Sequence, residues 1–193
     1  MNSARSEPAA RAKPAWAPQG SYFAYEVLAG TVLGLFGALV SLVFNIVGAL
    51  VVPPPAGLAP DPLNLIRVYL TFPMKDAALT TDNGVALAIG CCLYLFTGMA
   101  LGVPFQVAQA RILPNGTLRG RLILATVVGL LVWIVNFYCI LSWLQPLLFG
   151  DRWIVRLIPW WVGMLTHLVF GWTMALMYQW AVFAPYRTFE EQS

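Results

Sequence analysis

Four long stretches of the sequence contain no Asp, Glu, Lys or Arg, and this feature limits most strongly what the chain can fold into. They cover residues 27–52, 85–110, 122–149 and 157–184. Each exceeds the roughly 20 residues that an α-helix needs to cross a hydrocarbon core of about 30 Å. The runs are continuously apolar, whereas strands of a membrane β-barrel span about 10 residues and alternate apolar with polar side chains. We therefore predict four transmembrane helices.

The overall composition agrees with a protein whose main solvent is lipid. Apolar residues make up 60% of the 193 residues and charged residues only 10%, whereas a soluble domain carries about 25% charge. Short turns around Pro114 and at residues 150–156 should join neighbouring spans as antiparallel partners. The predicted fold is all-α, an integral membrane four-helix bundle built from two antiparallel hairpins.

The sequence outside the spans divides into three segments of different character. Residues 1–21 are rich in Ala and Pro and should form a disordered N-terminal arm, residues 22–184 form the four-helix domain, and residues 185–193 form a C-terminal tail. The loop at 53–84 carries six of the 14 prolines. Within it, residues 63–72 are apolar but too short to span the membrane, so we expect them to lie in the membrane interface or to pack on the helix ends. The segment would then serve either as a lid over an outward-facing cavity or as a plain connector.

The distribution of Lys and Arg predicts the orientation, because loops on the cytoplasmic side retain these residues. One side of the predicted membrane holds seven of them: Arg5, Arg11, Lys13, Arg111, Arg119, Arg121 and Arg187. The other side holds four: Arg67, Lys75, Arg152 and Arg156. We expect a multi-pass protein of a bacterial inner (plasma) membrane with both termini in the cytoplasm. The basic residues are spread over several loops, so no nucleic-acid partner is expected.

Small residues recur along the spans at helical spacing, which indicates helix-packing surfaces. Lipid tails are as apolar as Leu, so membrane helices associate through close contact of small residues and through interhelical hydrogen bonds. The predicted packing positions are Gly30, Gly34, Gly37, Ser41 and Gly48 in the first span and Gly163, Gly171 and Ala175 in the fourth. Other membrane helices, from this chain or from partner subunits, should lie against them.

A few polar side chains fall at similar depths on the four spans and form a candidate polar layer. A rise of about 1.5 Å per residue places Asn136 near the midplane and Asn45, Tyr94, Cys139 and His167 somewhat outward of it. These residues either hydrogen-bond between helices or form a small site for a quinone headgroup, a haem or a substrate. A haem with two histidine ligands would need a second chain, because the sequence has a single histidine. The three cysteines lack metal-ligand spacing. We expect no cofactor and no metal.

No motif indicates catalysis. The sequence lacks a P-loop, a G-x-G-x-x-G turn, an H-E-x-x-H helix and a G-x-S-x-G turn, and the spans lack the charged groups that pumps and ion-coupled transporters need. We therefore expect a non-catalytic accessory or scaffolding subunit of a larger bacterial energy-converting complex, respiratory or photosynthetic, with lipid and other integral membrane subunits as partners. The alternatives are a homo-oligomeric small-solute channel and a cytochrome-like anchor that binds quinone or haem around His167.

Overall fold

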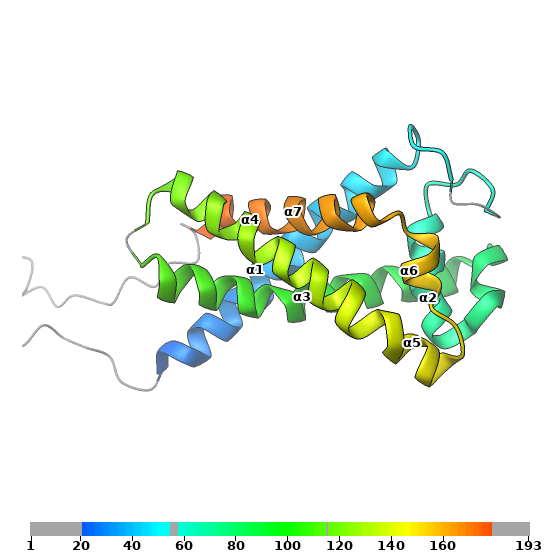
Figure 1. Ribbon diagram of the computed structural model, residues 1–193, viewed down its shortest axis with the longest axis horizontal. Helices are drawn as coiled ribbons and strands as arrows, with labels where there is room; N and C mark the ends of the chain where they lie inside the picture. The colour runs from blue at the N-terminus through cyan, green and yellow to red at the C-terminus, as the bar shows by residue number, and fades with distance from the viewer. Residues whose placement is uncertain (1–20, 55–57, 115, 179–193) are drawn as a thin grey trace, which may run out of the picture.

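The computed structural model describes residues 21–54, 58–114 and 116–178. The predicted arm up to residue 20, the predicted tail and residues 179–184 of the fourth predicted span lie outside the described residues. Within the described part every regular element is a helix (Figure 1). The elements are α1 (Ser21–Gly48), α2 (Asn64–Met74), the 3-10 helix η1 (Lys75–Thr80), α3 (Gly84–Ile112), α4 (Leu118–Ile134), the π-helix η2 (Val135–Leu141), α5 (Ser142–Phe149), α6 (Trp153–Leu157) and α7 (Trp160–Met177).

Four of these helical segments are long and apolar enough to cross a membrane. They are Phe23–Gly48, Gly84–Ile112, Leu118–Phe149 and Trp160–Met177. The predictions of an all-helical fold and of four apolar spans are thus confirmed for the described residues, and the chain fits a multi-pass membrane protein. Each segment corresponds to one predicted span, but the bounds differ by several residues.

The differences at the helix ends follow from capping and from proline. Residues 49–52 leave the first helix and turn ahead of Pro53, because proline has no N–H and restricts the residue before it. Pro159 separates α6 from α7 for the same reason. The side chain of Asn83 accepts hydrogen bonds from two N–H groups at the start of α3. The Thr117 hydroxyl caps α4 in the same way by accepting from Gly120.

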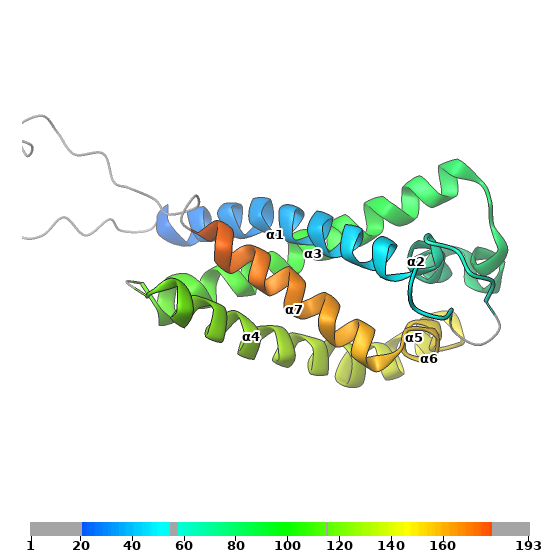
Figure 2. The same cartoon turned by 90° about the horizontal axis from the view of Figure 1, so that it is seen from above.

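The four long helices cross one another instead of running parallel. The most extensive contacts join α1 to α3, α4 to α7 and α1 to α7. α3 and α4 lie close together near the turn that connects them and diverge toward the opposite end (Figure 2). We call the side of that turn the turn end and the side of α2, α5 and α6 the cap end. The bundle is therefore tightly closed between α1 and α3 but spread at the cap end.

Glycines bring the backbones of α1 and α3 into direct contact. A Cβ atom on Gly34 would lie 2.5 Å from the Gly98 carbonyl oxygen and 2.9 Å from the Gly102 Cα, too close for any side chain. The other predicted packing positions fall into two groups. In the first group, a Cβ on Gly30 would lie 2.8 Å from the Val103 Cα, Cβ atoms on Gly37, Gly163 and Gly171 would meet the rings of Phe170, Phe137 and Phe105, and Ser41 and Ala175 are buried. The second group is Gly48 alone, where a Cβ would meet no atom within 4 Å.

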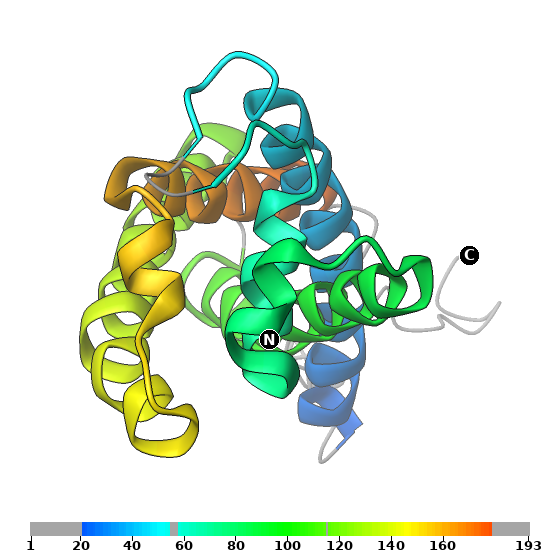
Figure 3. The same cartoon turned by 90° about the vertical axis from the view of Figure 1, so that its right-hand side faces the viewer.

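The predicted loop between the first two spans folds into a cap across one end of the bundle. α2 and α6 lie across the ends of the long helices (Figure 3). Ile66 and Thr71 of α2 are fully buried. The Arg67 guanidinium is held by Asp61 and Asp82, each at 2.9 Å, and by the Thr81 carbonyl oxygen. Residues 63–72 thus pack on the helix ends.

One buried glutamine ties the cap to the third span. Gln145 is 0% exposed. Its Oε1 accepts the Ile154 N–H over 3.0 Å, and its Nε2 donates to the Thr71 hydroxyl over 3.3 Å. The Trp153 indole N–H donates to Asp76 over 2.6 Å. These bonds satisfy polar groups that would otherwise be buried without partners, and they connect α2, η1, α5 and α6 into one unit.

The third span changes its helical geometry in the middle. Residues Val135–Leu141 form a π-helix, a wider turn that is often found at functional sites. Pro146 lies a few residues further on and cannot donate a backbone hydrogen bond. The Ser142 hydroxyl donates to the Tyr138 carbonyl oxygen and the Trp143 indole to the Cys139 carbonyl oxygen. Side-chain donors thus supplement the backbone hydrogen bonds of this segment.

Candidate functional site

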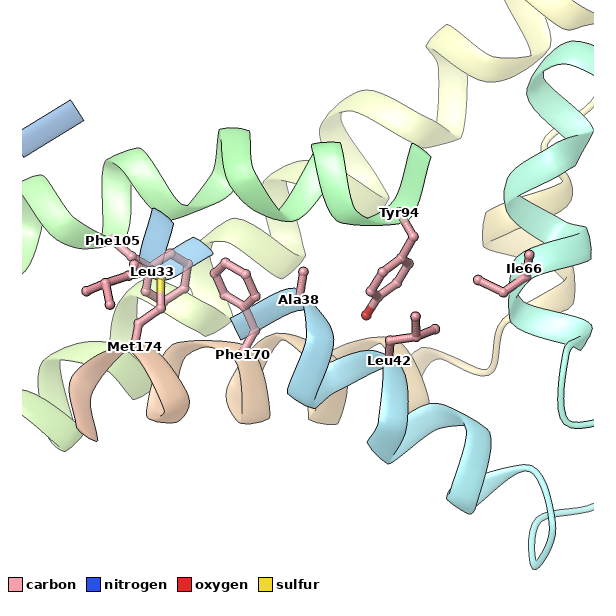
Figure 4. Close-up of a cluster of buried hydrophobic side chains, with 8 residues drawn as sticks. All are labelled: Leu33, Ala38, Leu42, Ile66, Tyr94, Phe105, Phe170 and Met174. Carbon is pink, nitrogen blue, oxygen red and sulfur yellow. The ribbon is translucent and has the colours of Figure 1, made fainter. Parts of the chain in front are cut away.

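Polar side chains of α1, α3 and α7 meet inside the bundle. The Ser41 and Tyr94 hydroxyls are 2.8 Å apart. The Asn45 amide donates to the Ser41 carbonyl oxygen over 2.7 Å and to the Thr166 hydroxyl over 3.0 Å. Figure 4 shows the Tyr94 ring reaching from α3 toward α1 between Ala38 and Leu42. Two of the predicted polar residues, Asn45 and Tyr94, therefore take part in interhelical hydrogen bonding.

The other predicted polar residues lie close to this network, with one exception. His167 Nδ1 lies 2.7 Å from the Gly163 carbonyl oxygen. His167 and Asn136 are half-buried and line the interior of the bundle. Cys139 instead is exposed on the outer surface, so the structure does not bring it to His167.

Two adjoining hollows occupy the centre of the bundle and share most of their polar lining. Tyr69, Tyr94, Asn136, Thr166 and His167 line both of them. One extends toward α3 and the other toward the cap. We call the two together the interior cavity. It collects His167, Asn136 and Tyr94, three of the four residues that the sequence singles out as a candidate binding site.

An open groove lies beside the interior cavity at the cap end. It encloses about 760 Å³, counting the space at its open mouth, and is lined mainly by apolar side chains from the end of α1, the start of α2 and the α6–α7 junction. Leu65 and Ile158 line both this outer groove and the interior cavity. Asn45 and Gly48 also line the outer groove, which explains why a Cβ on Gly48 would meet open space.

Apolar side chains fill the bundle on the turn-end side of the cavity. Phe105 of α3, Leu33 of α1 and Phe170 and Met174 of α7 pack together there (Figure 4). The Phe105 and Phe170 rings meet edge to face at 5.3 Å. This cluster separates the interior cavity from the turn end.

Charged and amide groups gather at the turn end itself. The Arg121 guanidinium lies 3.7 Å from the centre of the Tyr178 ring and donates to the Gln109 carbonyl oxygen, while the Gln109 side chain donates to the Arg121 carbonyl oxygen. Arg111 pairs with Glu26 at 3.0 Å. Arg121 has no carboxylate partner among the described residues.

The two ionisable groups of the cap that bear on the site have shifted pKa values. Desolvation by burial works to raise the pKa of Asp61, but the Leu63 N–H and the Arg67 guanidinium outweigh it and hold that pKa below its ordinary value. Burial raises the pKa of the Tyr69 phenol, and the nearby Tyr94 adds to the shift. Tyr69 therefore keeps its proton and can donate a hydrogen bond into the interior cavity.

Sequence reasoning missed Tyr69 and Thr166 as lining residues. Tyr69 lies in the loop, and only the folding of that loop onto the bundle brings its ring to 5.0 Å from that of Tyr94. Thr166 directly precedes His167, and its polar side chain on an apolar helix is the signal that was available. Within the described part of the chain, no group of three His, Cys, Asp or Glu side chains is placed to hold a metal ion.

The four apolar helices define the class as a multi-pass helical membrane protein, and the interior cavity gives it a polar site among these helices, next to the cap. Comparisons with protein families, with curated proteins and with solved structures find no match for the chain.

Proposed function

We propose that the chain is a non-catalytic accessory subunit of a larger bacterial energy-converting membrane complex, respiratory or photosynthetic. The observation that carries the proposal is a row of small residues on the outer face of α3. Gly84, Ala88 and Cys92 follow one another at intervals of four and are all exposed. They lie on the half of α3 that diverges from α1 toward the cap end (Figure 2). Small residues at this spacing let a second helix approach closely.

The contrast with α1 supports a protein partner over lipid at this face. The exposed side chains of α1 are mostly bulky, for example Phe36, Val43 and Val47, and such side chains suit contact with lipid tails. Bulky exposed side chains of α3, among them Val85 and Ile89, flank its row of small residues, so that row is a narrow strip. Inside the bundle, by comparison, Gly34 and Gly98 show that the chain uses small residues where one helix packs on another. We infer that a helix of a partner subunit covers the row on α3.

A photocrosslinking experiment tests this proposal in the native membrane. The full-length chain, with Cys91 and Cys139 replaced by Ser, carries a benzophenone maleimide on Cys92. The matched control moves the single cysteine to the lipid-facing α1 position in a Val43→Cys, Cys92→Ser chain. We expect Cys92 to crosslink to a second integral membrane protein and position 43 to yield no protein adduct. Equal results from the two positions, or crosslinks only between copies of this chain, would contradict the proposal; the second outcome would favour a homo-oligomeric channel.

The proposed orientation places the turn end and both termini in the cytoplasm of a bacterial inner membrane, with the spans running alternately as antiparallel hairpins. At the cap end, Arg67 and Arg156 are paired with carboxylates. At the turn end, Arg111 pairs with Glu26, whereas Arg119 and Arg121 have no carboxylate partner within the described residues; Lys75 and Arg152 at the cap end have none there either. The support for the proposed orientation is the larger number of Lys and Arg residues on the turn-end side of the chain. A membrane-impermeant thiol reagent should label an Asp82→Cys variant from the periplasm and leave an Arg119→Cys variant unlabelled, both in a chain without its native cysteines.

A further inference from the structure

The interior cavity takes no part in the proposed subunit contact, which lies on the outer face of α3. We propose that this cavity binds the ring of a neutral quinone-type lipid and that the outer groove holds the apolar tail of the same molecule. The proposal goes beyond the subunit function and stands on separate observations, namely the hydrogen-bonding groups of the cavity, its lack of charge and the two wall residues that it shares with the groove.

Polar groups of the cavity lining divide into those already bonded and those left over. The Tyr94 and Thr166 hydroxyls are engaged with Ser41 and Asn45. In contrast, the Tyr69 hydroxyl and the Asn136 amide form no hydrogen bond with another described residue, although both residues line both hollows. Both residues are half-buried, and their polar groups are open to the hollows that they line. A ligand with oxygen atoms on its ring would satisfy them.

His167 supplies a hydrogen-bond acceptor to the same cavity. The Gly163 carbonyl oxygen can only accept a hydrogen bond, so Nδ1 of the imidazole carries the proton in the 2.7 Å contact between them. In the neutral ring Nε2 is then an acceptor. The cavity thus combines a phenol donor, an amide that both donates and accepts, and an imidazole acceptor. This set can bind the carbonyl oxygens of a quinone and also the hydroxyls of its reduced form.

The charge and shape of the lining favour a flat, neutral molecule. None of the residues that line the two hollows is Asp, Glu, Lys or Arg, so a charged ligand would lose its hydration without gaining a counter-charge. Aromatic side chains form much of the wall. The Phe137 ring meets the His167 ring edge to face at 6.1 Å, and Phe170 lines the hollow on the other side. Aromatic rings in such positions pack well around another ring.

The outer groove gives the tail of such a molecule a place to lie. Leu65 and Ile158 belong to both the cavity and the groove, so the two spaces adjoin. The groove walls include Phe44, Val52 and Leu157, which suit an isoprenoid chain. A water-soluble ligand of the same polarity would leave this apolar groove unused.

Binding of a defined quinone to the purified full-length protein tests the proposal. The probe is a benzoquinone that carries one isoprene unit, and the protein is held in phosphatidylcholine nanodiscs. Bound quinone is extracted and quantified by chromatography, with empty nanodiscs as the blank. We expect saturable binding of about one quinone per chain. Uptake that does not saturate, or that equals uptake by empty nanodiscs, would overturn the proposal.

Variants separate binding in the cavity from partitioning into lipid. Tyr69→Phe and Asn136→Leu should each raise the Kd by about 3- to 10-fold, the range that follows from losing one hydrogen bond. The matched control is Tyr138→Phe, the same change on an exposed tyrosine outside the cavity, and it should leave the Kd unchanged. Equal affinities of all three variants would overturn the assignment to the cavity. Thermal unfolding of each variant verifies that it is folded.

A substitution in the groove tests the placement of the tail. Gly48 lines the groove, and a Cβ there meets no atom within 4 Å, so the Gly48→Leu side chain starts in open space at the groove wall; thermal unfolding verifies that the variant is folded. This variant should bind the isoprene-bearing quinone several-fold more weakly and bind tail-free benzoquinone as the unmodified protein does. Equal loss for both ligands, or no loss for either, would contradict a tail in the groove. Loss of quinone binding with partner crosslinking unchanged would show that the two proposals stand independently.

Discussion

Replacing Gly34 with Ala should weaken the bundle through one defined contact. The new methyl group would lie 2.5 Å from the Gly98 carbonyl oxygen and 2.9 Å from the Gly102 Cα. Ordinary van der Waals contact begins at 3.4 Å, so α1 and α3 would have to separate by about 0.9 Å, the difference between 3.4 Å and 2.5 Å. Both neighbours are backbone atoms and cannot rotate away. Overpacking of this kind costs about 1–3 kcal/mol, and the displacement would also strain the bond between Ser41 and Tyr94.

The matched control is Gly48→Ala, the same chemical change on the same helix. A Cβ at Gly48 meets no atom within 4 Å, and Ala favours helix by about 0.5–1 kcal/mol relative to Gly. Unfolding in mild micelles titrated with SDS, followed by circular dichroism, measures both free energies. We expect Gly34→Ala to lower the free energy of unfolding and Gly48→Ala to leave it unchanged or raise it. If Gly34→Ala were as stable as the control, the glycine contact between α1 and α3 would not hold the bundle together.

Three further predictions concern the cap and use the same titration. Gln145→Leu removes the acceptor of the buried Ile154 N–H and should cost about 1–3 kcal/mol; an unchanged midpoint would show that this bond is unimportant. Lys75 has φ 53° and ψ −141°, a backbone conformation that is strained for every residue except glycine. Lys75→Gly should therefore stabilise the fold by about 1 kcal/mol or more. A less stable variant would show that the backbone at Lys75 is not strained. The pKa of Asp61 lies below its ordinary 3.8, so its pairing with Arg67 stabilises the fold above pH 3.8, and this stabilisation is lost as the pH falls through the lower pKa of the folded state. Asp61→Asn should therefore abolish the loss of stability in acid. If the variant lost stability in acid as the unmodified protein does, Asp61 would not be the group responsible.

The membrane spans could be predicted from sequence because their signal is local. Four runs without charge identify four helices regardless of how these pack. The crossing of α1 and α3 depends on Gly34 meeting Gly98 and Gly102, residues 64 to 68 positions further along the chain. The sequence shows the small residues but not which helix they meet. The same limit applies to the cap, where the partners of Arg67 come from both sides of α2.

The candidate site was predictable in its residues but not in its geometry. The positions within the predicted spans put four polar residues at similar depths, namely Asn45, Tyr94, Asn136 and His167. The structure places all four in or beside the interior cavity. Cys139 lies three positions after Asn136, which in an α-helix would put it on nearly the same face. The wider turn of η2 moves it further round, and it is exposed. From the sequence we predict a regular α-helix over this span and not this π-helix.

The mass of the protein released from its own membrane tests the central claim most directly. The tagged full-length chain is expressed in its native membrane, extracted in a mild detergent and measured by native mass spectrometry without crosslinking. The account predicts an assembly in which the 21.2 kDa chain is joined in fixed ratio by at least one different integral membrane protein. A species with the mass of this chain alone, or of copies of this chain only, would contradict it.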